Sequence, residues 1–346
     1  MAIDLRPFMQ NYDVIIVGDG IGARVLLHEM AKSQFFLDKS ILQIHNPTNF
    51  PLCSFNTTSV VSGGIHKKGL SPLGDLLVDS YDSFVSFWEK HPHIADRSKQ
   101  FYIFDENQEQ KKKEQFLTRY GDDFASFYGA QAIDKECYIV YPEKLMDCLK
   151  ENYSKLDITS LEQSVTNLSS HTVHTDSTSF KSSSIILCTG AYTSFLNHDL
   201  ELSRPGKSVS GSYLLFEDVD LSDSFVLSLG HYNIIYRKSS KQLLFGGTSY
   251  EGHIHYNNQR DIRSNFEKVL SFADLERELE RDLDISKAKV LTGLRHKCSK
   301  RLPVSKEVSD GVFLFSGFYK NGFTFPFELA NSLCDDIELR LNRPHS

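Results

Sequence analysis

The stretch from Tyr12 to Ala23, YDVIIVGDGIGA, decides the fold of this chain of 346 residues. Its first half, Tyr12 to Val17, is a short apolar run that ends abruptly at a glycine, which is typical of a buried strand. Gly18, Gly20 and Ala23 then match the pattern G-x-G-x-x-G/A. There the first glycine permits a tight turn, the second lets the backbone approach a pyrophosphate, and the small third residue lets helix and strand pack. The stretch therefore predicts a dinucleotide-binding turn, and the alternative is a glycine-rich turn with a structural role.

The segments that follow complete a strand–turn–helix–strand unit. Ile21 to Lys32 contains no proline and predicts a helix, whose N-terminal N–H groups would face the phosphates. Ile41 to Ile44 predicts the second strand. An acidic residue at the end of that strand usually holds the ribose hydroxyls. Here His45 and Asn46 stand in its place, and either side chain is able to hydrogen-bond a hydroxyl.

The rest of the chain carries two kinds of pattern. Strand and helix signals that suit a parallel sheet recur in the middle and at the C-terminal end, around 185–191 and 312–340. Longer strand signals separated by turns suit an antiparallel sheet, at 213–216, 234–237 and 243–245. Further helices are expected over Asp75 to His91, from Pro142 onward and over Asp261 to Asp284.

This order predicts an α/β protein, α+β overall, with a Rossmann-like dinucleotide-binding domain built from separated segments. A substrate domain with an antiparallel sheet is inserted into it. We assign residues 1–90, 141–205 and 290–346 to the first domain. Residues 91–140 and 206–289 are assigned to the second.

Composition narrows the class of protein. The net charge of −7 and the pI of about 6.0 argue against a nucleic-acid partner. Six scattered cysteines without a CxxC pair indicate reduced thiols in a cytoplasmic protein. No apolar stretch is long enough for a membrane helix, and the histidines lack the spacing of a metal site. We therefore expect a cytoplasmic protein without a metal.

Short motifs along most of the chain resemble one flavoprotein family. Besides the glycine turn they are TSVVSGGIH at 58–66, Tyr141-Pro142, LCTGA at 187–191, GGT at 246–248, GLR at 293–295 and GFYKNGF at 317–323. In this order and spacing they resemble the FAD-dependent D-amino-acid-oxidase-type superfamily, with its glycine oxidase and sarcosine oxidase branches. The resemblance implies an FAD-dependent oxidoreductase that oxidises the C–N bond of a small amine or amino acid by hydride transfer to flavin N5.

The resemblance also implies which residues hold FAD. They are Gly18, Gly20, Gly22, Ala23, His45, Asn46, Ser62, Gly63, Gly64, Val165, Thr189, Gly190, Gly317, Asn321, Gly322 and Phe323. Sarcosine oxidases attach their flavin to a cysteine in the general region of Cys298. Because Cys298 is off-register with that attachment site, we expect non-covalent FAD.

Lys320 and His66 are the candidate catalytic residues. Lys320 lies in the turn that resembles the family's turn over the flavin, where a fixed cation would hold a substrate carboxylate or assist flavin reoxidation. The alternative is a solvated surface lysine. His66 follows Gly63-Gly64 in the flavin loop and would hydrogen-bond the flavin or the substrate, or be satisfied by backbone. The arginine of the glycine oxidase branch after GLR is replaced here by Ser299, and His296 replaces a proline.

Two other functions stay open at this level. The stretch from Gly293 to Pro303, GLRHKCSKRLP, also resembles the oxidase module that matures a wobble uridine side chain in tRNA. A cluster of Lys and Arg near the flavin would favour that function. The other alternative is a non-catalytic flavin-binding protein.

Overall fold

The computed structural model describes residues 10–46, 53–63, 67–103, 110, 113–114, 117, 125–127, 130–169, 171–196, 206–252, 259–270 and 283–343. The chain forms two compact units, and it passes between them four times. Unit 1 consists of Met1–Ser54, Met146–Ser208 and Arg295–Ser346. Unit 2 consists of Phe55–Leu145 and Val209–Leu294. The units thus alternate along the sequence, as an insertion requires.

Unit 1 is built on a sheet with its first strand, β1 (Gln10–Val17), in the interior. Its strand order is β17-β18-β10-β1-β2-β7, and the run from β18 to β7 is parallel. β17 is antiparallel to β18. A hairpin of β8 and β9 joins the sheet because β9 pairs with β10. The bounds are β2 Ser40–His45, β7 Asp157–Glu162, β8 Val165–Ser169, β9 Thr172–Thr175, β10 Ser179–Leu187, β17 Val304–Ser309 and β18 Val312–Ser316.

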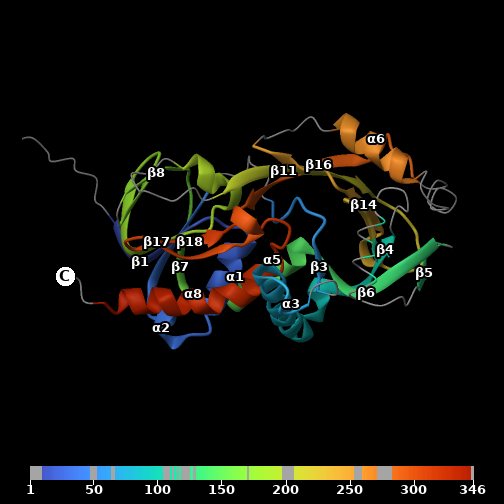
Figure 1. The fold of residues 1–346 in the computed structure, drawn as a ribbon. Helices are drawn as coiled ribbons and strands as arrows, with labels where there is room; N and C mark the ends of the chain where they lie inside the picture. Colours follow the sequence, from blue (N-terminus) through green and yellow to red (C-terminus); the bar gives the residue numbers. More distant parts are fainter. Residues whose placement is uncertain are drawn as a thin grey trace, which may run out of the picture. The chain divides into compact units, whose positions relative to one another are not determined.

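The apolar run of β1 is buried on both faces of this sheet. Ile15 and Val17 pack with Leu168 and Val173 of the β8–β9 hairpin. The helices α1 (Ile21–Met30) and α8 (Phe325–Leu341) pack against each other, and both contact strands of the sheet (Figure 1). Burial on both faces explains why β1 is a continuous apolar run without alternation.

The sheet reverses its strand order next to β1. The chain continues from β1 to β2 on one side, and it places β10 on the other side later. In open α/β sheets a ligand binds beyond the carboxyl ends of the strands at such a switch point. The glycine turn follows β1 at this place, and residues 188–190 follow β10.

Unit 2 contains a mixed sheet in the order β15-β11-β14-β13-β12-β4-β6-β3. Neighbouring strands are antiparallel except β12 and β4, which are parallel. β16 pairs with β11, and β5 pairs with β6. The bounds are β3 Val60–Ser62, β4 Ala95–Ile103, β5 Ala125–Phe127, β6 Ala130–Val140, β11 Lys207–Phe216, β12 Phe225–Leu229, β13 Tyr232–Arg237, β14 Gln242–Gly246, β15 Tyr250–Glu251 and β16 Lys289–Lys297.

Two helices cover parts of this sheet with aromatic side chains. In α6 (Gln259–Leu270) the ring of Phe266 lies 5.0 Å, centroid to centroid, from each of the rings of Phe216 and Phe245. In α3 (Pro72–Lys90) Phe84 and Trp88 pack on Tyr138 of β6. The short helices are α2 Gln34–Leu37, α5 Pro142–Asn152, η1 Pro92–Ile94, η2 Gly190–Phe195, η3 Lys238–Ser240 and η4 Ser299–Arg301.

The predicted fold class is confirmed, with differences in detail. The predicted dinucleotide-binding unit, its two strands and its helix are present, and so are the antiparallel strands between 213 and 245. Residues 55–90, assigned above to the cofactor domain, group with unit 2 by their contacts. The helix predicted over Asp261 to Asp284 is seen as α6, and residues 271–282 lie outside the described part. No helix in the described part of the chain has the length and apolar character needed to span a membrane.

Candidate functional site

The turn after β1 is held where only glycine fits. Gly18 has φ +123°, and a Cβ there would lie 2.5 Å from the carbonyl oxygen of Cys188, which follows β10. The Gly18 N–H donates to the carbonyl of Ile44 at 2.7 Å. The backbone is therefore tied to both neighbouring strands at the switch point.

The N-terminus of α1 has its first N–H group bonded to one hydroxyl, that of Ser54. Gly20 is the N-cap residue and adds no capping side chain. The Ile21 N–H donates to Ser54 Oγ at 3.0 Å, and a Cβ on Gly20 would lie 3.1 Å from the same oxygen. Within the described part of the chain, the Ser54 hydroxyl accepts this hydrogen bond and donates none. Sequence reasoning missed Ser54, because its partner is 33 residues away and no local pattern connects them.

The small residues that follow let the C-terminal turn approach α1. Ala23 is fully buried. A Cβ on Gly22 would lie 2.8 Å from Cε2 of Phe318, whose ring packs on Phe315 with centroids 4.9 Å apart. Gly22, which we predicted at the cofactor, thus has a packing role that the sequence does not reveal.

The end of β2 has an imidazole where a carboxylate usually holds the ribose hydroxyls of a dinucleotide. His45 ends β2, and its Nε2 lies 3.2 Å from Ser160 Oγ of the neighbouring strand β7. Asn46 follows and is exposed. Val165 opens β8 and is partly buried. His45 is therefore oriented by β7, with Asn46 beside it.

The segment after β10 forms a compact hydroxyl-bonded turn. Thr189 Oγ1 lies 2.7 Å from Thr193 Oγ1, and the Thr193 hydroxyl donates to the Gly190 carbonyl at 2.7 Å. Gly190 has φ +56° and open space where a side chain would be. Both residues predicted for the cofactor thus lie at the carboxyl end of β10.

The turn after β18 packs on the first turn of α1. Gly317 has φ +84°, and a Cβ there would lie 2.5 Å from Cys298 Sγ. The carbonyl of Asn321 accepts N–H bonds from Thr324 at 3.1 Å and Phe325 at 3.0 Å. The Cβ position of Gly322 lies 3.8 Å from Ile21 Cγ2. The predicted residues of this turn, which are Gly317, Asn321, Gly322 and the buried Phe323, therefore lie beside the glycine turn.

Lys320 belongs to a basic cluster, which we define as Arg295, Lys297, Lys300, Arg301 and Lys320. Three of its cations surround the ring of Tyr319, with Arg295 Cζ, Lys297 Nζ and Lys320 Nζ at 5.5, 5.7 and 5.9 Å from the ring centroid. The sequence segments 295–303 and 316–324 contain no acidic residue. Three residues of this region are non-glycines with positive φ: Lys300, Arg301 and Tyr319. Such backbone conformations concentrate at functional sites.

The cluster changes the acidity of Lys320. Partial burial lowers the pKa of the Lys320 ammonium group, although the side chain as a whole stays exposed. Tyr319 opposes this effect, and the positive charges of Arg295, Arg301 and Lys297 add to it. Lys320 therefore gives up its charge at a lower pH than an ordinary lysine.

Unit 2 holds the remaining predicted residues that the structure describes. Ser62 Oγ lies 3.4 Å from the Tyr102 hydroxyl, and the ring of Tyr81 fills the place where a Cβ on Gly63 would be. Gly64 and His66 lie outside the described residues. The predicted role of His66 therefore stays a prediction.

A buried arginine anchors the strand that leads to Ser62. Arg237 is 6% exposed, and its Nη2 donates to Ser59 Oγ at 2.6 Å and to the Val140 carbonyl at 3.3 Å. The guanidinium lies 5.8 Å from the centroid of the Tyr141 ring, and burial lowers the pKa of Arg237. These contacts give Arg237 a structural role in unit 2.

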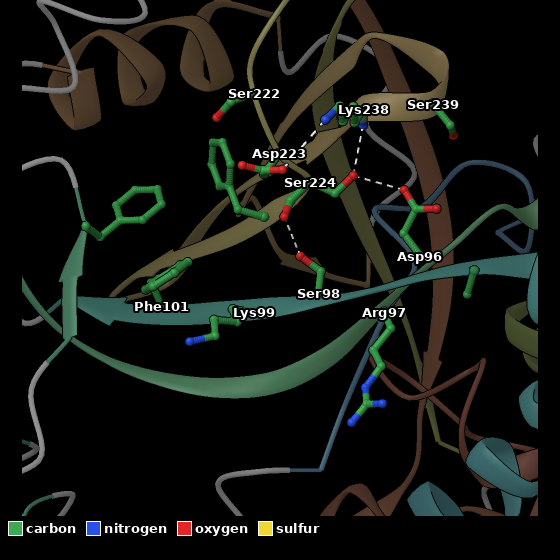
Figure 2. Close-up of a pocket in the computed structure, with 13 residues that line it drawn as sticks. Asp96, Arg97, Ser98, Lys99, Phe101, Ser222, Asp223, Ser224, Lys238 and Ser239 are labelled. Atoms are coloured by element: carbon green, nitrogen blue, oxygen red, sulfur yellow. Dashed lines mark hydrogen bonds and ion pairs between the residues drawn. The ribbon is translucent and has the colours of Figure 1, made fainter.

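Unit 2 also carries a surface groove of about 1030 Å³ over the parallel strands β4 and β12. Its polar side chains bond to one another, as Figure 2 shows: Ser98 donates to the Ser224 carbonyl at 2.5 Å, and Ser224 Oγ donates to Asp96 at 2.9 Å. Lys238 lies 3.7 Å from Asp223. The groove thus contains a hydrogen-bonded group of side chains centred on Ser224, and its chemistry differs from that of the glycine turn.

The described residues contain no group of three His, Cys, Asp or Glu side chains placed to bind a metal. The residues of unit 1 do fit a dinucleotide. The glycine turn has no room for a Cβ at Gly18, the helix N-terminus offers N–H groups, and Ser54 adds a hydroxyl.

We predict that Gly18→Ala destabilises the protein and removes FAD binding, because the methyl group meets the Cys188 carbonyl and φ is unfavourable. Gly252→Ala is the matched control, since Gly252 has φ +75° but open space. Conformational strain and overpacking together should lower the free energy of unfolding of Gly18→Ala by about 2–5 kcal/mol. The control should lose about 1–2 kcal/mol, from strain alone. Urea unfolding and FAD titration of both variants measure this, and equal losses would contradict the assigned packing.

The flavin should be non-covalent. Cys298 is buried beneath Gly317, and burial raises the pKa of its thiol to about 11, so the nucleophilic thiolate is scarce at neutral pH. Acid precipitation should leave the yellow colour in the supernatant. Colour that stays in the pellet and disappears in Cys298→Ser would show that the thiol carries the flavin.

Known proteins share this architecture and its sequence signature. The model of the FAD dependent oxidoreductase family matches residues 50–333. Glycine oxidase from Geobacillus kaustophilus aligns with a TM-score of 0.71 at 17% identity, over 98% of this chain and 96% of that chain. FAD-bound L-α-glycerophosphate oxidase from Mycoplasma pneumoniae aligns with a TM-score of 0.74 at 15% identity, over 97% and 96%.

L-proline dehydrogenase from P. horikoshii aligns with a TM-score of 0.69 at 12% identity, over 94% and 93%. No curated protein matches the sequence. At these identities the structural neighbours show a common fold, whereas the family model covers most of the chain. The chain belongs to the FAD-dependent oxidoreductase family of D-amino-acid-oxidase type, and the protein is an FAD-dependent oxidoreductase.

Proposed function

We propose that this protein oxidises the C–N bond of a small amine or amino acid that carries negative charge, and that the basic cluster binds the anionic group. The observation that carries the proposal is the placement of three cations around Tyr319, in a turn that packs against α1. Glycine oxidase, named among the neighbours, acts on an amino acid, and glycerophosphate oxidase on a phosphate ester. Both kinds of substrate carry an anionic group, a carboxylate or a phosphate, which a cluster of cations is able to bind.

Concentrated positive charge is the reason to expect an anion. The protein has a net charge of −7, yet the segments 295–303 and 316–324 carry five cations and no acid. Mutual repulsion among these cations raises the free energy of the unliganded cluster. A carboxylate or phosphate would relieve that repulsion and form charge-assisted hydrogen bonds. The cluster is therefore suited to orient a substrate by its charged end.

The chemistry then needs little more than positioning. FAD, when bound, would supply the hydride acceptor for the carbon that bears the nitrogen, and oxygen or another acceptor would then take up the electrons. Water hydrolyses the resulting imine to a carbonyl compound and an amine. The residues of this chain hold the anionic end, so that the C–H bond is presented in one orientation. No strong general base is required when the amine binds in its neutral form.

Lys320 offers a point charge and not the two-pronged fork of an arginine. An ammonium group binds a carboxylate with less geometric restriction than a guanidinium does. Because the pKa of Lys320 is lowered, the charge that holds the substrate is present below that lowered value and is lost as the pH rises through it. Substrate affinity should therefore decline on the alkaline side.

We predict that Lys320→Met raises KM for an anionic amine and leaves FAD bound. A lost charge-assisted contact is worth about 1.5–3 kcal/mol, so kcat/KM should fall roughly 10- to 150-fold. Lys320→Arg should keep the affinity and remove the alkaline decline, since arginine stays charged. The exposed Lys306 supplies the control Lys306→Met, expected to behave like the wild type.

Stopped-flow measurement of both half-reactions distinguishes the roles of Lys320. If Lys320 binds the anion, flavin reduction in Lys320→Met should be slower at low substrate concentration and should recover at high substrate concentration. A defect in reoxidation alone would assign Lys320 to the oxygen reaction. Unchanged half-reactions in Lys320→Met would remove Lys320 from the site.

The same cluster favours a second candidate, oxidation of a side chain on a nucleic acid such as the wobble uridine of tRNA. Cations next to a partly exposed aromatic ring, that of Tyr319, are able to bind phosphates and stack a base. In that case tRNA should inhibit or replace the small substrate, with an affinity that falls steeply with salt. We expect instead that tRNA leaves amine oxidation unchanged at physiological salt. Flavin reduction by tRNA alone would favour the second candidate, and reduction by neither substrate would favour a non-catalytic flavoprotein.

A further inference from the structure

Asp19 stands in the glycine turn, between Gly18 and Gly20, where the dinucleotide pyrophosphate is expected. A carboxylate at this place repels phosphate charge, and it also competes with phosphate for the positive end of α1. An unpaired Asp19 would therefore weaken FAD binding. The structure shows how this chain accommodates it.

Arg24, in the second turn of α1, bonds both carboxylate oxygens of Asp19. Nε donates to Oδ1 at 3.0 Å and Nη2 donates to Oδ2 at 2.8 Å, the two-pronged geometry of strong arginine–carboxylate pairs. Nη1 of Arg24 donates to the carbonyl of Met146 at 3.1 Å, which fixes the guanidinium from its other side. The pair is therefore held in one arrangement.

Gln43 of β2 ties the same carboxylate to the turn. Its Nε2 donates to Asp19 Oδ1 at 3.2 Å and to the Gly18 carbonyl at 3.0 Å. The side chains of Arg24 and Asp19 are 12% and 23% exposed, so water screens the pair only in part. Burial alone would lower the pKa of Arg24, but the hydrogen bond and the charge of Asp19 raise it. The carboxylate of Asp19 thus favours the charged form of the Arg24 guanidinium.

We infer that Arg24 is a positioning residue for FAD, which neutralises Asp19 and holds its carboxylate away from the phosphate-binding N-terminus of α1. Arg24 acts through Asp19 and does not itself bind the phosphates. This inference concerns cofactor binding and is independent of the proposed substrate.

The alternative is an ion pair that only stabilises unit 1. The two roles predict different effects of the substitutions on FAD affinity. If the pair were merely structural, loss of either partner would weaken FAD binding in parallel with a loss of stability. If Arg24 neutralises Asp19, removing Arg24 and removing Asp19 change the affinity for FAD in opposite directions. Without Arg24 a bare carboxylate faces the phosphates, whereas without Asp19 the guanidinium adds positive charge near them.

The test is FAD titration of flavin-free full-length protein, followed by flavin fluorescence at low and high salt, with thermal unfolding of each flavin-free variant. Arg24→Gln should weaken FAD binding on the order of tenfold, and Asp19→Asn should tighten it about threefold to tenfold. Both changes in FAD affinity should become smaller at high salt, because salt screens the charges. The double variant should return to near the wild-type affinity.

Arg24→Lys is the matched control, because it keeps the charge and loses both the fork and the bond to Met146. Neutralisation predicts that its FAD affinity stays within about threefold of the wild type, whereas a structural clamp predicts the loss seen in Arg24→Gln. If Arg24→Gln does not fold, Asp19→Asn decides alone. Unchanged or weaker FAD binding in Asp19→Asn would overturn the inference.

Discussion

The close approach of two strand ends is the constraint on which the rest of unit 1 depends. The Gly18 backbone lies so near the Cys188 carbonyl that a Cβ would overlap it, and the Cys188 N–H donates to the Val17 carbonyl at 2.9 Å. This contact brings the carboxyl ends of β1 and β10 together, although they are about 170 residues apart in sequence. Because the turn cannot move away from β10, α1 begins at a fixed place, and its N–H groups are preorganised for an anion.

Everything else in the cofactor region is arranged around this fixed helix. Phe318 approaches α1 where Gly22 leaves space, and Gly322 brings the turn after β18 close to Ile21. The basic cluster is carried on that turn and on the end of β16, so its cations are positioned by packing against the dinucleotide-binding unit. A cluster of like charges is tolerable here because Tyr319 offers its ring to three cations. Charge and packing together thus define a site that suits an anion.

Local patterns were strong enough to predict the βαβ unit at the start of unit 1. The βαβ unit follows from a buried strand, two glycines and a helix without proline, all within 30 residues. The strands β11, β13 and β14 of unit 2 were predicted from strand signals separated by turns, whereas β4, β6 and β12 were not singled out. The strand β4 mixes charged and apolar residues, and its parallel pairing with β12 joins segments more than 120 residues apart. No local signal specifies such a partner.

The sequence by itself determined the fold class, the dinucleotide turn and the family, because each rests on residue types at short and fixed spacings. Only the tertiary structure showed that Ser54 bonds the start of α1, that Arg24 forms an ion pair with Asp19, and that Gly22 admits Phe318. It also gathered Arg295, Lys297 and Lys320 around one ring. The physical reason is the same in each case. A hydrogen bond, an ion pair or a ring contact depends on the direction of side chains in space, and spacing along the chain does not encode that direction when the partners lie in different elements.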